Sequence, residues 1–302
     1  MSLTREQAEA CTILRGTVGS TVHGLHIEDG LEDRDEMGVC LEPIEAAMGV
    51  YAPFEQFIYR SAAEREGRHD APSQGGDLDL TIYSLRKYMR LALKGNPTVI
   101  QLLFVPPDKL QTGDARGFQL RELAPYIVSR RAGVAYLGYL HAQRQRLLGE
   151  RGNGGHGQPR RGLVDKFGFD VKYAMHMLRL GIQGVELLST GRLTLPIAEP
   201  ERAWLFGVRQ GKESIDICLT RAGELEKELR DLVTTSPIRD EPDIPIVEDW
   251  MVRIYFRAWS ATRKTRDIAE DAARWARAES AMAFDAVASS DESGKADDVR
   301  KV

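Results

Sequence analysis

The order of apolar and polar positions in the first 125 residues is typical of short strands joined by helices and turns. Thr4 and Gln7 have the spacing of a capping box, which predicts a helix near the N-terminus. Runs that are β-branched or that alternate predict strands at 12–18, 33–41 and 79–83. The first strand enters a turn at Gly19-Ser20, and Ser84 is placed to cap a helix that continues to about residue 94.

Two breaks interrupt this region. Residues 61–76 are polar and contain Gly and Pro, which predicts a loop. Gly95 and Pro97 end the helix that Ser84 begins, and a further short helix is expected after them.

Beyond about residue 125 the strand patterns stop and apolar residues recur at helical spacing. Helices are predicted at 132–148, 169–188, 200–209, 214–233, 247–260 and 262–282. The final segment, 283–302, is polar and is predicted to be disordered. The sequence therefore predicts an α+β fold with a mixed α/β domain at 1–125, an all-helical domain at 126–282 and a disordered tail.

Composition narrows the class of protein. A formal net charge of −4 argues against a chain-wide electrostatic hold on nucleic acid but leaves room for a local basic groove. The three cysteines are far apart and odd in number, which argues against a disulfide framework or a zinc site. With no apolar signal core and no run long enough to cross a bilayer, we expect a cytoplasmic protein without a membrane partner.

The chemistry centres on an Asp-x-Asp pair. On a strand, Asp33 and Asp35 point to the same side, with Cα atoms about 6–7 Å apart. Like charges this close repel, and a divalent cation between them removes the penalty. A two-metal site for phosphoryl chemistry requires a third carboxylate nearby. Asp79 is the candidate for this third position, and Asp77 is the alternative because it shares the same strand face.

The turn at Gly19-Ser20 supplies a place for phosphate. Glycine lets backbone N–H groups approach an anion closely, and the Ser20 hydroxyl adds another donor. The competing interpretation is an ordinary turn beside a solvated acidic surface, because Glu28, Asp29, Glu32 and Glu36 also lie in this stretch.

The segments GSTVHGL and EDRDEMGV together resemble the signature of the nucleotidyltransferase superfamily that includes DNA polymerase beta. The closer similarity is to the predicted nucleotidyltransferases of bacteria and phages. The positions that carry the resemblance are Gly19, Ser20, Gly24, Leu25, Asp33, Asp35, Gly38 and Val39. Two further blocks, 79–104 and 170–193, resemble that subfamily as well.

The resemblance implies a nucleotidyltransferase-type mixed sheet with a helical partner domain. It implies transfer of a nucleoside monophosphate from an NTP, with release of pyrophosphate. Asp33, Asp35 and Asp79 would bind two Mg²⁺ ions, with Mn²⁺ as an alternative ion. Glu32 stands where the family often has serine, and His23 stands where an aromatic residue is common, so the choice of nucleotide stays open.

The predicted helix at 169–188 carries two stripes. Its apolar stripe consists of Val171, Met175, Leu178, Ile182 and Val185, and its polar stripe of Lys172, His176, Arg179, Gln183 and Glu186. Periodicity alone favours a solvated polar face, with Arg179 contacting Gln183 or Glu186 at the surface. The family block, which has Lys and His at Lys172 and His176, instead implies that this face is a wall of the nucleotide cleft. Lys172, His176 and Arg179 would then contact the triphosphate.

The acceptor is less defined by the sequence. The basic segment 141–162 suits an RNA backbone, although a solvated loop is the preferred interpretation, and an RNA 3′ end is the expected acceptor. A protein hydroxyl, a small molecule, or a non-catalytic nucleotide-binding or RNA-binding module are the alternatives. The sequence predicts no particular oligomeric state.

Overall fold

The computed structural model describes residues 2–26, 33–51, 53–68, 71, 74–150, 158–261, 267 and 270–277. Two compact units are present, residues 1–250 and residues 251–302. The division at residue 125 into a sheet domain and a helical domain stays a prediction. The acidic residues Glu28, Asp29 and Glu32, the proposed tail at 283–302 and most of the helix expected at 262–282 lie outside the described residues.

A five-stranded mixed sheet forms the centre of the first unit, in the order β3-β4-β2-β1-β5. Strands β2 and β4 are parallel, and the other neighbouring pairs are antiparallel. The strands are β1 (Thr12–Thr17), β2 (Arg34–Cys40), β3 (Gln56–Arg60), β4 (Leu78–Ser84) and β5 (Leu110–Gly113). The strands predicted near 12–18, 33–41 and 79–83 are therefore confirmed, whereas β3 and β5 were not predicted.

Strand β4 shows how the sheet separates core from site. Its side chains alternate strictly between buried and half-buried, as expected for a strand with one face on the core. Leu80 and Ile82 pack into an apolar cluster with Phe54 and Cys40. The other face presents Asp79, Thr81 and Tyr83 to a pocket.

Short helices surround the sheet. They are α1 (Arg5–Ala10), α2 (Gly19–His23), α3 (Ile44–Met48), α4 (Ser61–Glu66), α5 (Leu85–Ala92), α6 (Pro97–Ile100), α7 (Ala115–Glu122) and α8 (Ala124–Ile127), with 3₁₀ turns η1 (Gln101–Phe104) and η2 (Pro107–Lys109). The capping box at Thr4 is present, and Ser84 caps α5 as predicted. The loop predicted at 61–76 is wrong over its first part, because α4 occupies 61–66.

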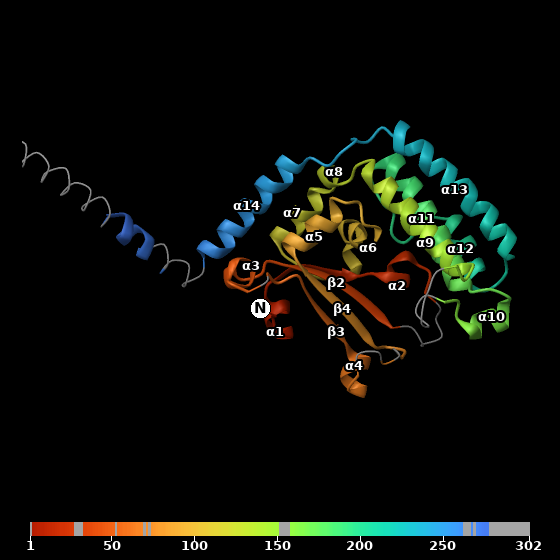
Figure 1. Ribbon diagram of the computed structural model, residues 1–302, viewed down its shortest axis with the longest axis horizontal. Coiled ribbons are helices and arrows are strands. Elements are labelled where there is room, and N and C mark those ends of the chain that lie inside the picture. The colour runs from red at the N-terminus through yellow and green to blue at the C-terminus, as the bar shows by residue number, and fades with distance from the viewer. Residues whose placement is uncertain are drawn as a thin grey trace, which may run out of the picture. The chain divides into compact units, whose positions relative to one another are not determined.

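Longer helices follow. They are α9 (Arg131–Leu147), α10 (Arg161–Phe167), α11 (Val171–Thr190), α12 (Glu201–Arg209), α13 (Ile215–Thr235) and α14 (Ile244–Ser260). Figure 1 shows α9, α11, α12 and α13 side by side, near the end of the sheet where α2 lies. This confirms the predicted α+β class, a mixed sheet with flanking helices followed by a helical region. No helix in the described part of the chain is long and apolar enough to cross a membrane.

Helix α11 lies at the centre of the helical region because small residues let its neighbours approach. A Cβ added at Gly181 would lie 2.9 Å from Leu225 of α13 and 3.2 Å from Leu140 of α9. A Cβ at Gly184 would meet Tyr136 of α9 at 3.0 Å. These contacts also show that α9 and α11 are antiparallel, since Leu140 follows Tyr136 along α9 while Gly181 precedes Gly184.

Candidate active site

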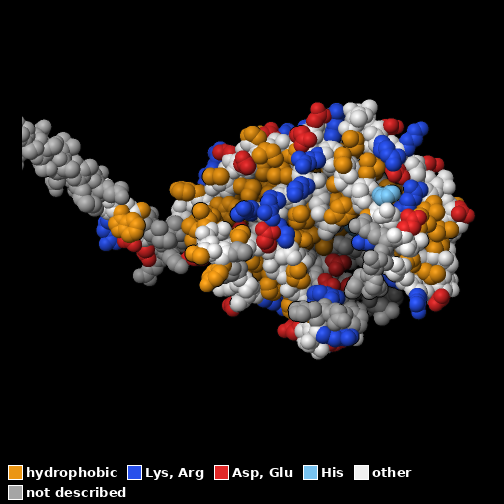
Figure 2. Space-filling view, viewed as in Figure 1, with side chains coloured by type: hydrophobic (Ala, Val, Ile, Leu, Met, Phe, Trp, Pro, Cys, Tyr) orange, Lys and Arg blue, Asp and Glu red, His pale blue; other side chains and the backbone are white. Residues whose placement is uncertain are grey.

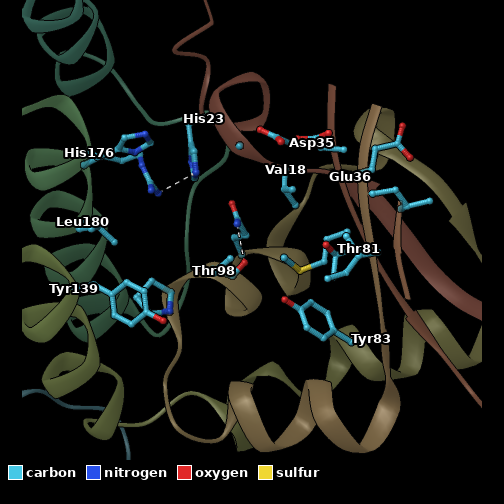
Figure 3. A pocket seen from close by; sticks show the side chains of 18 of the residues that line it. Val18, His23, Asp35, Glu36, Thr81, Tyr83, Thr98, Tyr139, His176 and Leu180 are labelled. Carbon is cyan, nitrogen blue, oxygen red and sulfur yellow. Dashed lines mark hydrogen bonds between the residues drawn. The ribbon is translucent and has the colours of Figure 1, made fainter. Parts of the chain in front are cut away.

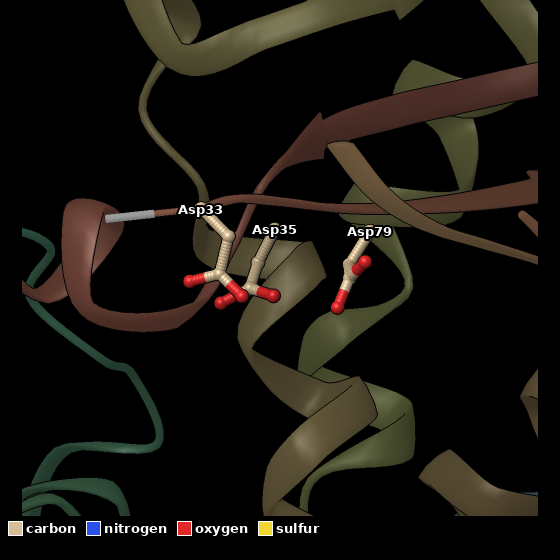
Figure 4. Close-up of side chains that lie close together, drawn as sticks. All are labelled: Asp33, Asp35 and Asp79. Atoms are coloured by element: carbon tan, nitrogen blue, oxygen red, sulfur yellow. The ribbon is translucent and has the colours of Figure 1, made fainter. Parts of the chain in front are cut away.

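Three carboxylates meet on neighbouring strands of the sheet. Asp35 of β2 and Asp79 of β4 are directly paired in the parallel register, and Asp33 precedes β2 on the same side as Asp35. One oxygen from each of the three lies within 4.8 Å of the others, and all three side chains are partly buried (Figure 4). Oxygens in an octahedral Mg²⁺ shell lie up to about 4.2 Å apart. The donor set therefore fits a divalent cation with little adjustment.

Gly19, at the start of α2, lies against this cluster. Its φ of 69° is in the left-handed region, which glycine adopts without strain. An added Cβ would lie only 2.2 Å from Asp35 Oδ2. The Val18 N–H donates to the Asp35 carbonyl at 2.9 Å, which ties the approach to α2 directly to β2. The position admits no side chain as long as Asp35 keeps its place.

Asp77, the alternative third carboxylate, has a different role. It accepts hydrogen bonds from Arg65 at 2.6 Å, Ser61 at 2.8 Å and the Gln74 N–H at 2.7 Å. The bond from Arg65, followed by that from the Gln74 backbone, holds the pKa of Asp77 well below its usual range. Asp77 thus anchors the segment before β4, and of the two strand acids it is Asp79 that joins Asp33 and Asp35.

Arg60 of β3 was not predicted and lies beside the cluster. Its guanidinium Nε is 3.3 Å from each carboxylate oxygen of Asp79, and Nη2 donates to the Ala71 carbonyl at 3.3 Å. Arg60 and Asp79 are cross-strand partners in the β3–β4 pair, which places opposite charges face to face. Arg60 was not predicted because β3, the strand that carries it, was not predicted.

A pocket of about 590 Å³ opens between the carboxylates and the helices. This volume is typical of a site for one small-molecule ligand. Asp35, Asp79 and Gly19 line it on the sheet side, and His176 and Arg179 of α11 line it on the helical side (Figure 3). In the space-filling view, acidic side chains lie inside a hollow whose edge carries Lys and Arg side chains (Figure 2).

The helical wall is built on a hydrogen-bonded group around His23. Arg179 Nη1 donates to His23 Nε2 at 3.0 Å and to Gln183 Oε1 at 2.7 Å, and the Gln183 amide lies 3.2 Å from His23 Nδ1. His23 and Gln183 are buried. The predicted contact between Arg179 and Gln183 therefore exists. The prediction that this contact lies on a solvated surface is wrong, because Gln183 is buried.

Arg179 is a cation without an anionic partner among the residues that the structure describes. It forms no ion pair within that part of the chain, and its buried Nε has no hydrogen-bond partner there. Burial lowers the pKa of Arg179 to about 10, so that it stays charged at neutral pH. A partly buried cation whose Nε is shielded from solvent is normally paired, which makes this wall a candidate binding surface for an anionic ligand.

His176 stays neutral beside this cation. Burial, followed by the charges of Arg179, Arg160, Arg209 and Lys172, lowers the pKa of His176 to about 3. Burial also holds the pKa of His23 well below its usual value, with Arg179 adding to the shift. Both histidines therefore enter the site as neutral hydrogen-bonding groups.

These shifts predict a pH-dependent stability. The folded state binds fewer protons than the unfolded chain below about pH 6.5, so the free energy of unfolding should fall as the pH is lowered. For His176 the loss between pH 7 and pH 5 is up to about 2 kcal/mol. Thermal melts of ligand-free protein should show a smaller decrease for His176→Gln than for the wild type. His141→Gln, an exposed change on α9, should keep the wild-type dependence, and equal slopes for all three proteins would contradict the assignment.

The structure brings most, but not all, of the predicted residues together. Gly19, Asp35, Asp79, His176 and Arg179 line the pocket, and Asp33 completes the carboxylate cluster. Ser20 and Lys172 are not among the lining residues. Their proposed contacts with phosphate stay predictions.

The arginines of the basic segment 141–162 make different contacts. Arg144 pairs with Glu226 at 3.0 Å, and Arg160 pairs with the buried Asp170 at 3.0 Å. Arg146, by contrast, lines the pocket. Helix α9 continues to Leu147, so the first part of the predicted loop is helical, and residues 151–157 lie outside the described residues.

Carboxylates on neighbouring strands of a mixed sheet, with a glycine turn packed against them, define a nucleotidyltransferase of the DNA polymerase beta superfamily, as the resemblance implied. The sequence profile of RlaP, the RNA repair pathway DNA polymerase beta family, matches residues 1–253, and the chain belongs to that family.

Other comparisons are more distant. The crystal structure of a nucleotidyltransferase-like protein from Exiguobacterium sibiricum 255-15 is similar over 76% of this chain and 71% of that chain, with 11% sequence identity and a TM-score of 0.26. No curated protein matches the sequence.

Proposed function

We propose that this protein transfers a nucleoside monophosphate from an NTP to the 3′ hydroxyl of an RNA, with release of pyrophosphate, in a reaction that depends on Mg²⁺. The observation that carries the proposal is the convergence of Asp33, Asp35 and Asp79 on a pocket whose opposite wall holds the partly buried cation Arg179. One side of this pocket suits metal ions and the other suits phosphate. The name of the RlaP family supports RNA as the acceptor.

Three carboxylates at this distance call for positive charge between them. Arg60 offsets one negative charge at Asp79, but three acids this close remain mutually repulsive. Asp33, Asp35 and Asp79 are the expected ligands of two Mg²⁺ ions, or of Mn²⁺ in their place. Bound there, the ions supply positive charge to the attacking and leaving oxygens.

The residues of the chain provide the remaining parts of the reaction. Arg179 and the neutral His176 hold the triphosphate through charge-assisted and ordinary hydrogen bonds. Gly19 keeps the backbone close to the phosphates, and we retain Ser20 and Lys172 as further contacts. An acceptor hydroxyl held in line with the α-phosphorus then attacks, pyrophosphate departs, and one carboxylate of the cluster takes the proton. Positioning and neutralisation of charge are the main contributions in such phosphoryl transfers.

Arginines at the pocket support a polyanionic acceptor. Arg60 and Arg146 line it from the sheet and from α9 respectively, and phosphate contacts dominate the affinity of proteins for nucleic acids. The free thiols Cys11, Cys40 and Cys218 fit a reducing compartment, and we place the reaction in the cytoplasm.

The test is a transfer assay with α-labelled NTPs, Mg²⁺ and an RNA oligonucleotide that ends in a 3′ hydroxyl. We expect label on the RNA, no label on the same RNA with a blocked 3′ end, and loss of the product with a chelator. The double variant Asp33→Asn/Asp35→Asn should not label RNA. Asp108→Asn, a change at an exposed acid away from the cluster, is the matched control.

The other outcomes separate the alternatives. Label on total protein but not on RNA would replace the RNA acceptor with a protein hydroxyl. Pyrophosphate release with label on neither polymer would indicate a small acceptor. Wild-type labelling by the double variant would remove the proposed site altogether.

A further inference from the structure

Helix α9 presents three residues to the pocket at helical spacing. Tyr139, Gln143 and Arg146 all line it, and their separations of four and three residues place them on one face of the helix. The face begins with an aromatic ring, continues with an amide and ends with a cation. No part of the transfer chemistry requires the ring or the amide, so these two need a separate explanation.

The ring lies at an apolar end of the pocket. Asn96 Nδ2 donates to the Tyr139 hydroxyl at 2.9 Å, which fixes the ring, and the side chain remains 38% exposed. Leu180, Pro97 and Tyr83 line the pocket with it. Burial raises the pKa of Tyr83, and the Tyr139 phenol adds to the shift. Figure 3 shows Tyr139 and Tyr83 on the side of the pocket away from His23 and Asp35.

The phosphate-binding groups lie at the opposite end. Because α9 and α11 are antiparallel, Tyr139 is level with Leu180, Gln143 with His176, and Arg146 with the first turns of α11. His176, Leu180 and Tyr139 follow one another along the helical wall in Figure 3. The pocket therefore changes from cationic to aromatic along its length, in the order triphosphate, sugar and base of a nucleotide.

Gln143, one helical turn from Tyr139 on α9, has an unsatisfied amide oxygen. Within the described residues its buried Oε1 has no hydrogen-bond partner, and neither has Oε1 of Gln101, which also lines the pocket. Buried polar atoms are nearly always paired, so a ligand that supplies N–H donors is expected here. A glutamine amide pairs with two adjacent groups of adenine, its amino donor and a ring-nitrogen acceptor.

We infer that Tyr139 and Gln143 form a nucleobase subsite that prefers adenine to the pyrimidines, with the base stacked on Tyr139 and its amino edge bonded to the Gln143 amide. Uracil offers the two amide oxygens only its single ring N3–H, whereas an amino group carries two hydrogens. Cytosine has the amino group but covers less of the ring, so the expected order is ATP, then CTP, then UTP. The inference rests on the proposed function for the identity of the ligand as an NTP.

Binding is measured first, so that the result does not depend on transfer. Calorimetric titration with α,β-methylene ATP and its UTP counterpart, which cannot release pyrophosphate, should show ATP binding at least about 10-fold more tightly. Gln143→Leu should reduce this ratio to within about 3-fold, mainly by weakening the ATP analogue. Gln145→Leu, the same change two residues later on α9 and outside the set of pocket-lining residues, should keep the wild-type ratio.

The ring and the amino group are tested separately. Tyr139→Leu should weaken both analogues by about 5-fold or more, since stacking is tolerant of base identity, and Tyr139→Phe should bind more tightly than Tyr139→Leu. A triphosphate of purine riboside, which lacks the 6-amino group, should bind the wild type as weakly as ATP binds Gln143→Leu, with no further loss in that variant.

The two proposals fail in different ways. Equal binding of the ATP and UTP analogues by the wild type, or an unchanged ratio in Gln143→Leu, would overturn the adenine subsite even if transfer to RNA occurs. Selective ATP binding without transfer to any acceptor would support the subsite and overturn the proposed reaction.

Discussion

Replacing Asp35 by asparagine should reduce nucleotidyl transfer by at least about 10³-fold, which is the scale of losing a preorganised electrostatic group at a transferring phosphoryl centre. Asp35 is the central member of the cluster, paired in register with Asp79 and two residues from Asp33. An amide is nearly the same size but carries no charge for a metal ion. Single-turnover transfer with labelled ATP at saturating RNA is the measurement.

The same substitution should leave the fold intact. Removing one of three neighbouring negative charges relieves repulsion, so the Tm of metal-free Asp35→Asn should lie within about 4 °C of the wild type or above it. Mg²⁺ should raise the Tm of the wild type and of Asp108→Asn, but not that of Asp35→Asn. An active Asp35→Asn protein, or one that Mg²⁺ still stabilises, would show that the ions bind elsewhere.

Gly19→Ala should be the second most damaging change, by steric rather than electrostatic means. The added Cβ would lie 2.2 Å from Asp35 Oδ2, in a backbone conformation with φ of 69°. Either Asp35 or α2 has to move, and a displacement of about 1 Å at a reacting centre can cost about 10²-fold in rate. We expect a loss of at least that size in kcat.

Gly67→Ala is the matched control. Gly67 ends α4 with φ of 68°, and nothing among the described residues lies within 4 Å of an added Cβ. Both variants lose about 1–2 kcal/mol of stability to a side chain in the left-handed region, but only Gly19→Ala should lose activity. If the two variants lose stability and activity to the same extent, the contact between Gly19 and Asp35 has no functional importance.

Local sequence patterns predicted the parts of the site that lie on strongly patterned elements. The Asp-x-Asp pair and the strand carrying Asp79 could be located because β4 alternates strictly and because successive same-face residues on a strand point together. The register that pairs Asp35 with Asp79 could not be derived, since strand pairing is a long-range property. The resemblance supplied that step, as it did for His176 and Arg179.

The missed residues share a physical cause. Arg60 lies on β3, a short edge strand whose side chains are all partly exposed, so it gives little periodic signal. The hydrogen bonds from Arg179 and Gln183 to His23 form only because α2 packs against α11. These two helices are far apart in the sequence. Tyr139, Gln143 and Arg146 have helical spacing, but the sequence does not mark them as a separate polar face. Apolar residues lie on both faces of α9, so its hydrophobic pattern gives no clear division.

The ion pair between Arg60 and Asp79 would balance part of the negative charge of the cluster when the proposed metal ions are absent. Both side chains are roughly a quarter to a third exposed, and a contact of this kind contributes no more than about 1 kcal/mol. A divalent cation at the proposed site would therefore displace the guanidinium easily, and a protein treated with a chelator would keep part of its charge balance. We therefore expect removal of the metal to stop the proposed reaction reversibly. Adding the metal back should restore activity without unfolding and refolding of the protein.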